Sequence, residues 1–302
     1  MNSYRIMVSL LLGCMVYSSD LTSNGEKAHA ASRVVNHSAY TLLLAGLDRD
    51  PQSANRDRRT DLHTDSLVLL FSSVGSGEIN ALHIPRDTLV YTPGAGMMKI
   101  NSIRMFYGET TFRHAVERLT GFDVKAVVYT DFPQFKNAFR QLGRVPFFVD
   151  RTIDSPESQV RIAPGTHLLS PDEALAVARF RHEPLGDVGR VKRQVKLLHA
   201  AITCLHRLPL PAFQTVVTTL DPQITPQVAY YSYYFLHRMK TYHAYMLPGR
   251  FGVGREFGDF VVDASGMRAI KQALISTTPQ TRETMTWKSQ LDARDVGEVK
   301  IL

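Results

Sequence analysis

Short apolar runs without polar alternation are the feature that most constrains the fold of this chain. Such runs, each of strand length, are YTLLLAGLD at 40–48, SLVLLFSS at 66–73 and INALHIP at 79–85. A strand that is apolar on both faces belongs in a sheet that is covered on both sides. The turn residues between the second and third runs predict a hairpin.

Helical patterns alternate with further strand-like runs. Additional strands are predicted at AVVYTDF (126–132), VPFFVD (145–150) and DFVVD (259–263), and helices at 111–121, 132–143, 170–180 and from Arg190 onward. The helix near 170 has a complete start signal, with Ser170 as N-cap, Pro171 in the first turn and Glu173 placed to close a capping box. The alternation predicts an α/β fold, an αβα layered domain with a central mixed sheet covered by helices on both faces.

The chain divides into three parts. Residues 1–38 are expected to be a signal or lipoprotein-like anchor and a linker, 39–277 the folded domain, and 278–302 a polar, loosely held C-terminal tail. The apolar run at 6–17 is shorter than the roughly 20 residues that span a bilayer and is typical of a secretory signal. LLGC resembles a lipobox that would place a lipid on Cys14, AHA at 28–30 resembles a signal-peptidase site, and an uncleaved anchor is the third alternative.

Charge and composition narrow the classes of partner and chemistry. A net charge of +7 fits an anionic partner, which could be a nucleic acid, a phosphorylated substrate or a membrane surface. Two cysteines are too few for a disulfide framework or a cysteine zinc site. The sequence also has no P-loop, GxSxG or HExxH motif, and its histidines lack ligand spacing.

Carboxylates and an arginine occur where predicted strands begin or end. Asp48 follows the first strand, Asp65 precedes the second, and Arg86 and Asp87 follow the third. Two carboxylates together with phosphate oxygens and water suit Mg²⁺. The alternative interpretation is that the aspartates cap loop backbones and that Arg86 and Asp87 form a weak surface pair.

The stretch ARFRHEPLGDVGRVKRQ at 178–194 gathers positive charge around an expected turn at Gly186, Asp187 and Gly189. An extended backbone after the helix would turn Arg179 and Arg181 to one side, and Arg190 and Gln194 share a helix face. Guanidinium groups at a helix start favour a bound phosphate, whereas a solvated basic helix end is the alternative. Lys192 and Arg193 are expected to be ordinary surface charges. These clusters predict metal-assisted phosphoryl transfer.

The order of these motifs resembles the LytR–CpsA–Psr phosphotransferases of Gram-positive cell envelopes from about Tyr40 to Leu208. The residues that carry the resemblance are LLLAGLD, HTDSLVLL, IPRDT, KIN, YTDFPQF, APGTHLLSPDEALAVARFRH and GDVGRVKRQ. The resemblance implies an αβα domain with an apolar tunnel for a lipid tail. It also implies an enzyme on the extracytoplasmic face of the membrane, which moves a phosphoglycan such as a teichoic acid or capsular polymer from polyprenyl pyrophosphate to peptidoglycan.

The resemblance also assigns roles to residues. It implies Mg²⁺ or Mn²⁺ at Asp48 and Asp65, and Asp87 as the residue that holds Arg86. It implies pyrophosphate binding by Arg86, Lys99, Arg179, Arg181, Arg190 and Gln194, and catalytic participation of Asp65, Arg86, Asp87, Arg179 and Arg190. The general base is not assigned, and Asp65 is one choice among the carboxylates.

One departure keeps other functions open. His63 stands where the family usually has arginine. This weakens the case for full activity, unless the protonated His63 ring, Arg58 or Arg59 takes the place of that arginine. The alternatives are a polyprenyl-pyrophosphate hydrolase, a degenerate lipid-phosphate binder and a DNA-binding regulator. Because no helix-turn-helix or basic-aromatic pattern is evident, no nucleic-acid partner is expected.

Overall fold

The computed structural model describes residues 40–48, 63–72, 77–181, 186–220, 224–239, 241–252, 258–275 and 299–300. The expected anchor and linker at 1–38, with Cys14 and both processing sites, lie outside the described residues. No helix within these ranges combines the length and the hydropathy needed to cross a membrane.

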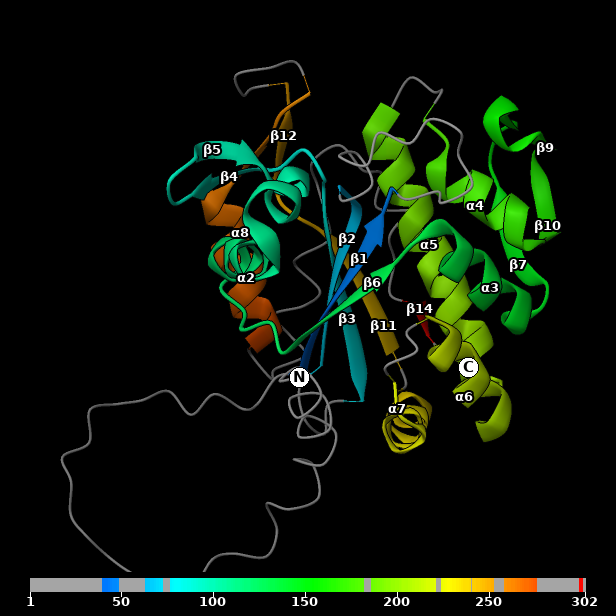
Figure 1. Cartoon of the computed structure of the whole chain (residues 1–302). Coiled ribbons are helices and arrows are strands. Elements are labelled where there is room, and N and C mark those ends of the chain that lie inside the picture. Colours follow the sequence, from blue (N-terminus) through cyan, green and yellow to red (C-terminus); the bar gives the residue numbers. More distant parts are fainter. Residues whose placement is uncertain are drawn as a thin grey trace, which may run out of the picture.

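A mixed sheet of six described strands forms the centre of the molecule (Figure 1), in the order β14–β11–β3–β2–β1–β6. In this order the strands are Val299–Lys300, Thr241–Met246, Glu78–Ile84, Thr64–Ser72, Tyr40–Leu47 and Ala126–Thr130. β2 pairs antiparallel with both β1 and β3, while β6 and β11 add parallel strands on either side of these three. The predicted β2–β3 hairpin is thus confirmed.

Helices cover both faces of this sheet, which confirms the predicted αβα class (Figure 1). On one side lie α2 (Ile100–Thr120) and α8 (Ala264–Ile275). On the other side lie α5, α6 and α7, and beside them α3 and α4; these helices span Gly186–His206, Leu210–Leu220, Pro226–Arg238, Phe132–Leu142 and Pro171–Arg179.

The side chains of β2 show why both faces need cover. Leu67, Leu69 and Phe71 pack into the core under α2 and α8. Val68 and Leu70 point the other way and pack into the core under α5, α6 and α7. A strand with apolar residues at both odd and even positions therefore lies between two cores, as its continuous apolar run predicted.

Small antiparallel pairs surround the central sheet. They are β4 (Leu89–Thr92) with β5 (Gly96–Lys99), β7 (Val145–Val149) with β10 (Gly165–Leu169), β8 (Ile153–Ser155) with β9 (Val160–Ile162), and β12 (Gly249–Phe251) with β13 (Phe260–Val262). A single 3-10 turn, Pro156–Ser158, joins β8 to β9. The predicted strands at 145–150 and 259–263 exist, but they belong to these small sheets.

The predicted helix start before α4 is confirmed. Ser170 Oγ accepts a hydrogen bond from Glu173 N (3.3 Å), and the Glu173 carboxylate accepts one from Ser170 N (2.7 Å). Asp131 and Gln134 form the same reciprocal pair at the start of α3. α3 and α4, which both border the candidate site, therefore begin at positions fixed by local sequence.

Three boundaries differ from the predictions. α5 begins at Gly186, so Gly186 and Gly189 lie inside a helix and the expected turn is absent. Glycine costs only about 1 kcal/mol in a helix interior, which is less than the roughly 1.5–3 kcal/mol gained by burying a side chain such as Val191. α2 begins at Ile100 with a break at Gly108 (φ 79°), and β14 attaches residues 299–300 of the expected tail to β11.

Candidate functional site

The predicted carboxylates and Arg86 meet at one edge of the central sheet because of strand direction. β1 ends where β2 begins, with Leu47 opposite Thr64. β3 ends at the same edge, since Ile84 lies opposite Leu67. Asp48, Asp65 and Arg86 therefore come from three neighbouring strands and share one side of the sheet.

Asp65 is the centre of the charged groups at this edge. Its Oδ2 atom accepts a hydrogen bond from Arg86 Nη1 at 2.7 Å and another from Arg181 Nη2 at 3.0 Å. Arg86 Nε donates to Asp87 Oδ2 at 3.3 Å, which fixes the other side of that guanidinium. One carboxylate thus orients two guanidinium groups toward a common space.

Asp48 lies nearby in a different electrostatic setting. Its Oδ1 atom is 3.9 Å from Arg179 Nη2, at the outer limit of an ion pair. Partial burial, followed by the charge of Asp65, raises the pKa of the Asp48 carboxyl above its usual value, although Arg179, Arg181 and Arg86 oppose the shift. The two carboxylates are therefore close enough to repel each other.

The end of α4 places its two arginines as the sequence predicted. α4 ends at Arg179, and Phe180 has extended backbone angles (φ −57°, ψ 131°). Arg179 reaches Asp48 and also stacks over the Phe132 ring at 4.4 Å, while Arg181 reaches Asp65. Extended geometry turns both guanidinium groups to the same edge.

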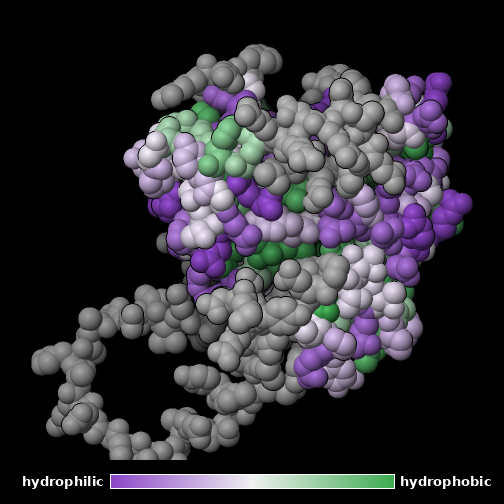
Figure 2. All heavy atoms as spheres, in the orientation of Figure 1, coloured by the Kyte–Doolittle hydropathy of each residue, from purple (hydrophilic) through white to green (hydrophobic). Residues whose placement is uncertain are grey.

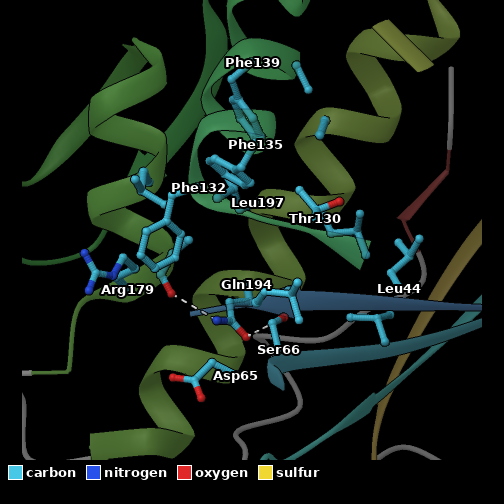
Figure 3. Close-up of a pocket in the computed structure, with 18 of the residues that line it drawn as sticks. Leu44, Asp65, Ser66, Thr130, Phe132, Phe135, Phe139, Arg179, Gln194 and Leu197 are labelled. Carbon is cyan, nitrogen blue, oxygen red and sulfur yellow. Dashed lines mark hydrogen bonds between the residues drawn. The ribbon is translucent and has the colours of Figure 1, made fainter. Parts of the chain in front are cut away.

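α5 supplies the inner wall of the site. Arg190 is 2% exposed and lines the same cavity as Asp48 and Asp65. Gln194, one turn further on, accepts from Ser66 Oγ at 3.3 Å (Figure 3) and donates to the Ala178 carbonyl at 3.0 Å. Gln194 therefore links β2 to α4.

A second group of charges extends from the site in another direction. Lys99 Nζ lies 3.5 Å from Asp87 Oδ1 and 3.6 Å from Asp259 Oδ1. Asp259 is buried beside β13, and the sequence analysis missed it because its only signal was an aspartate before a short strand. These three residues are not among those that line the cavity.

An apolar cavity of about 620 Å³ opens beneath the charged edge. Its charged end is lined by Asp48, Asp65, Arg86, Arg179, Arg181 and Arg190. Figure 3 shows Phe135, Phe139 and Leu197 above this end, and the walls continue along Leu142, Leu198, Ala201, Ile202, Leu205, Val216 and Leu220. The cavity thus joins a charged end to a chamber lined with apolar side chains, which agrees with the apolar tunnel that the resemblance implies.

Arg193 is not the ordinary surface charge that was predicted. It is 6% exposed, and its guanidinium donates to the carbonyl groups of Val177 (3.3 Å) and Phe180. These carbonyls lie at the C-terminal end of α4 and have no further helical turn to bond to. Arg193 therefore fixes the end of α4 from which Arg179 and Arg181 extend.

His63 lies next to Asp48 but does not face the cavity. Its carbonyl oxygen accepts a hydrogen bond from Asp48 N (3.2 Å), whereas its Nε2 atom is buried without a hydrogen-bond partner in the part of the chain that the structure describes. Its side chain is not among the lining of the cavity. Arg58 and Arg59, the other possible substitutes, lie outside the described residues.

Comparison with known proteins agrees with this geometry. A family model described as the LytR_cpsA_psr family matches residues 14–239. The Regulatory protein MsrR of Staphylococcus aureus is 29% identical over 167 residues, 55% of this chain and 49% of MsrR. The polyisoprenyl-teichoic acid–peptidoglycan teichoic acid transferase TagT of Bacillus subtilis is 28% identical over 193 residues, 62% of this chain and 59% of TagT. The chain spans about half the length of these curated relatives.

A solved structure has the same fold. The LytR-CPS2A-psr family protein YwtF (TagT) with bound octaprenyl pyrophosphate lipid superposes with a TM-score of 0.60 at 22% identity. The likeness covers 78% of this chain and 88% of that chain.

Proposed function

The chain belongs to the LytR–CpsA–Psr family, and we propose that it transfers a phosphoglycan from a polyprenyl pyrophosphate carrier to peptidoglycan on the extracytoplasmic face of the membrane. The observation that carries this proposal is the continuity of a charged end with an apolar cavity. A lipid pyrophosphate has the same two parts, an anionic head and a hydrocarbon tail. TagT, whose name describes a teichoic acid transfer to peptidoglycan, supports the reaction class.

The arginines bind the pyrophosphate in this proposal. Arg86 and Arg181 are already oriented by Asp65, while Arg179 is held by stacking on Phe132. Arg190 approaches from the buried side. Guanidinium groups match phosphate oxygens with paired hydrogen bonds, and positioned donors of this kind stabilise the charge of a phosphoryl transition state.

The proposed step is a displacement at phosphorus. A sugar hydroxyl of peptidoglycan attacks the phosphorus that carries the glycan, and a new oxygen–phosphorus bond forms. The bridging bond to the lipid phosphate breaks, and polyprenyl phosphate leaves with the electron pair. The hydroxyl proton passes to a carboxylate at the charged edge, where Asp65 is the first residue to test.

A divalent cation fits the same edge. The carboxylates of Asp48 and Asp65 repel each other, and a cation between them would relieve that repulsion. Within the described ranges no cluster of three or more potential ligand residues occurs, so the protein would supply two ligands. Mg²⁺ and Mn²⁺ accept one or two carboxylates and take their remaining ligands from phosphate oxygens and water. When bound, the cation would supply charge neutralisation at the pyrophosphate.

The direct test uses purified full-length protein, a polyprenyl-pyrophosphate-linked glycan and Mg²⁺, with and without a peptidoglycan acceptor. We expect release of polyprenyl phosphate together with a covalent glycan–peptidoglycan product, and less of both with a chelator. If polyprenyl phosphate is released at the same rate with and without the acceptor, and no covalent product forms, the protein is a hydrolase. No release under any condition contradicts both enzymatic functions.

Filling the apolar cavity is expected to weaken lipid binding. In Leu198→Trp, the larger ring occupies space next to Ala201 and Ile202 that the tail would otherwise use. Displacing two methylene groups costs about 1.6 kcal/mol at about 0.8 kcal/mol each, or roughly a tenfold loss of affinity. Calorimetry with polyprenyl phosphate measures this loss, and inorganic pyrophosphate is the matched ligand whose affinity stays unchanged. Equal losses for both ligands would contradict a lipid role for the cavity.

His63→Arg distinguishes an active transferase from a degenerate lipid-phosphate binder. Because Asp65 already holds two guanidinium groups, we expect the extra arginine to change turnover by less than about threefold. His114→Arg on the exposed surface of α2 controls for the added charge. A rise of tenfold or more in His63→Arg alone would favour the degenerate binder.

A further inference from the structure

An exposed apolar surface lies over the β4–β5 hairpin and the first turns of α2, next to the charged edge but outside the cavity. Figure 2 shows hydrophobic residues gathered over these elements. The exposed members are Tyr91, Met97, Phe106 and Tyr107, and we call them the hairpin surface. Apolar residues gathered into one exposed patch often mark a site where another molecule binds, whereas isolated exposed apolar residues do not.

Strand register connects the hairpin surface to the charged edge. Leu89 lies opposite Lys99 and Tyr91 lies opposite Met97, so these four residues share the outer face of the hairpin. Val90 and Met98 point to the opposite face and pack against the core. Lys99 contacts Asp87, whose other oxygen holds Arg86. Met97 therefore lies two strand positions, about 7 Å, from Lys99, and Tyr91 is the diagonal cross-strand neighbour of Lys99 at about 7–8 Å.

The geometry of the proposed phosphoryl transfer indicates which molecule binds this surface, and this inference therefore rests on the proposed function. In a phosphoryl transfer the attacking and leaving oxygens lie roughly in line across the phosphorus. The leaving polyprenyl phosphate points toward the apolar cavity, so the attacking hydroxyl arrives from the opposite side. The path from Arg86 through Asp87 and Lys99 leads away from the cavity to the hairpin surface.

We propose that the hairpin surface binds the acceptor, a glycan strand of peptidoglycan. Sugar rings carry apolar C–H faces edged by hydroxyl groups, and flat aromatic side chains with a polar tip suit such faces. Tyr91 (63% exposed) and Phe106 (64%) provide the ring faces. Lys99 and Asp87 lie between this surface and the reacting phosphorus, where a sugar hydroxyl must pass.

The test is the double variant Tyr91→Ala/Phe106→Ala in the full-length protein. We expect the KM for a soluble peptidoglycan acceptor to rise about tenfold, from the loss of two ring contacts, with kcat and the KM for the lipid-linked donor unchanged. Sedimentation with purified sacculi is expected to fall by a similar factor. The matched control is Phe148→Ala/Tyr234→Ala, which removes one phenylalanine (62% exposed) and one tyrosine (48% exposed) from β7 and α7.

The outcomes separate this inference from the proposed function. If the wild-type protein transfers glycan and the double variant keeps its acceptor KM, the inference is wrong and the function stands. If the wild type transfers nothing, sacculus sedimentation still decides whether the hairpin surface binds glycan. Loss of binding to anionic lipid vesicles with unchanged sacculus binding would instead assign the surface to a membrane. Melting temperatures of both double variants check that the fold is retained.

Discussion

Asp65→Asn is expected to lower kcat for release of polyprenyl phosphate by about 10²–10³-fold. The asparagine keeps the shape of the side chain but carries no charge, so Arg181 loses its ion pair with Asp65, and Arg86 keeps its pair with Asp87 but not the one with Asp65. Arg181 would then lose the orientation that positions it around a pyrophosphate, and Arg86 would no longer be held on the side of Asp65. The change also removes one of the two carboxylates offered to a cation.

The KM for the lipid-linked donor is expected to change little in this variant, or to fall, because the edge becomes more positive. A fall in kcat without a rise in KM indicates loss of an interaction that matters in the transition state. Asp123→Asn is the control, since Asp123 is an exposed aspartate that pairs with Lys125 far from the cavity. A kcat for Asp65→Asn within threefold of the wild-type value would remove Asp65 from the proposed mechanism.

The residues that meet at the charged edge of the sheet could be predicted because their position depends on the order and direction of the strands. The short turn between the second and third apolar runs predicted a hairpin, and Asp65 and Arg86 stand where its two strands begin and end. Once β1 is added beside β2, Asp48 has to join the same edge. The pattern therefore located the charged residues without any knowledge of their contacts.

The cavity could not be located in the same way. The apolar stripe of α5, which includes Leu198, Ile202 and Leu205, is the pattern of any helix packed on a core. Whether such a stripe meets side chains or an open chamber depends on the separation between α5 and the helices α3 and α6. That separation is set by tertiary packing, which local periodicity does not encode.

Arginine burial was likewise invisible in the sequence. Arg190 and Arg193 are three residues apart on the same helix; the face shared with Gln194 singled out Arg190, but nothing in the stretch GRVKRQ indicated that Arg193 would be buried. Arg190 faces the cavity, whereas Arg193 reaches the carbonyls at the end of α4. The two roles differ because the end of α4 packs next to Arg193 but leaves Arg190 facing the cavity, and this packing is a property of the tertiary fold.

Arg193→Met is expected to lower the free energy of unfolding by about 2–4 kcal/mol. Methionine replaces the aliphatic part of the side chain but leaves the carbonyl oxygens of Val177 and Phe180 buried without their donor. Each unsatisfied buried group costs roughly 1–3 kcal/mol. The contact of the guanidinium with the Phe180 ring, 5.1 Å from its centroid, is lost as well.

Urea denaturation measures this loss, and Arg140→Met on the exposed side of α3 is the control, expected to stay within about 0.5 kcal/mol of the wild type. Because Arg179 and Arg181 extend from the same end of α4, the KM for the lipid-linked donor should rise in Arg193→Met even at temperatures where the protein is fully folded. A variant with unchanged stability and unchanged donor KM would show that Arg193 does not fix the end of α4. Loss of stability alone would show that it supports the core but does not position the two arginines that we assign to the pyrophosphate.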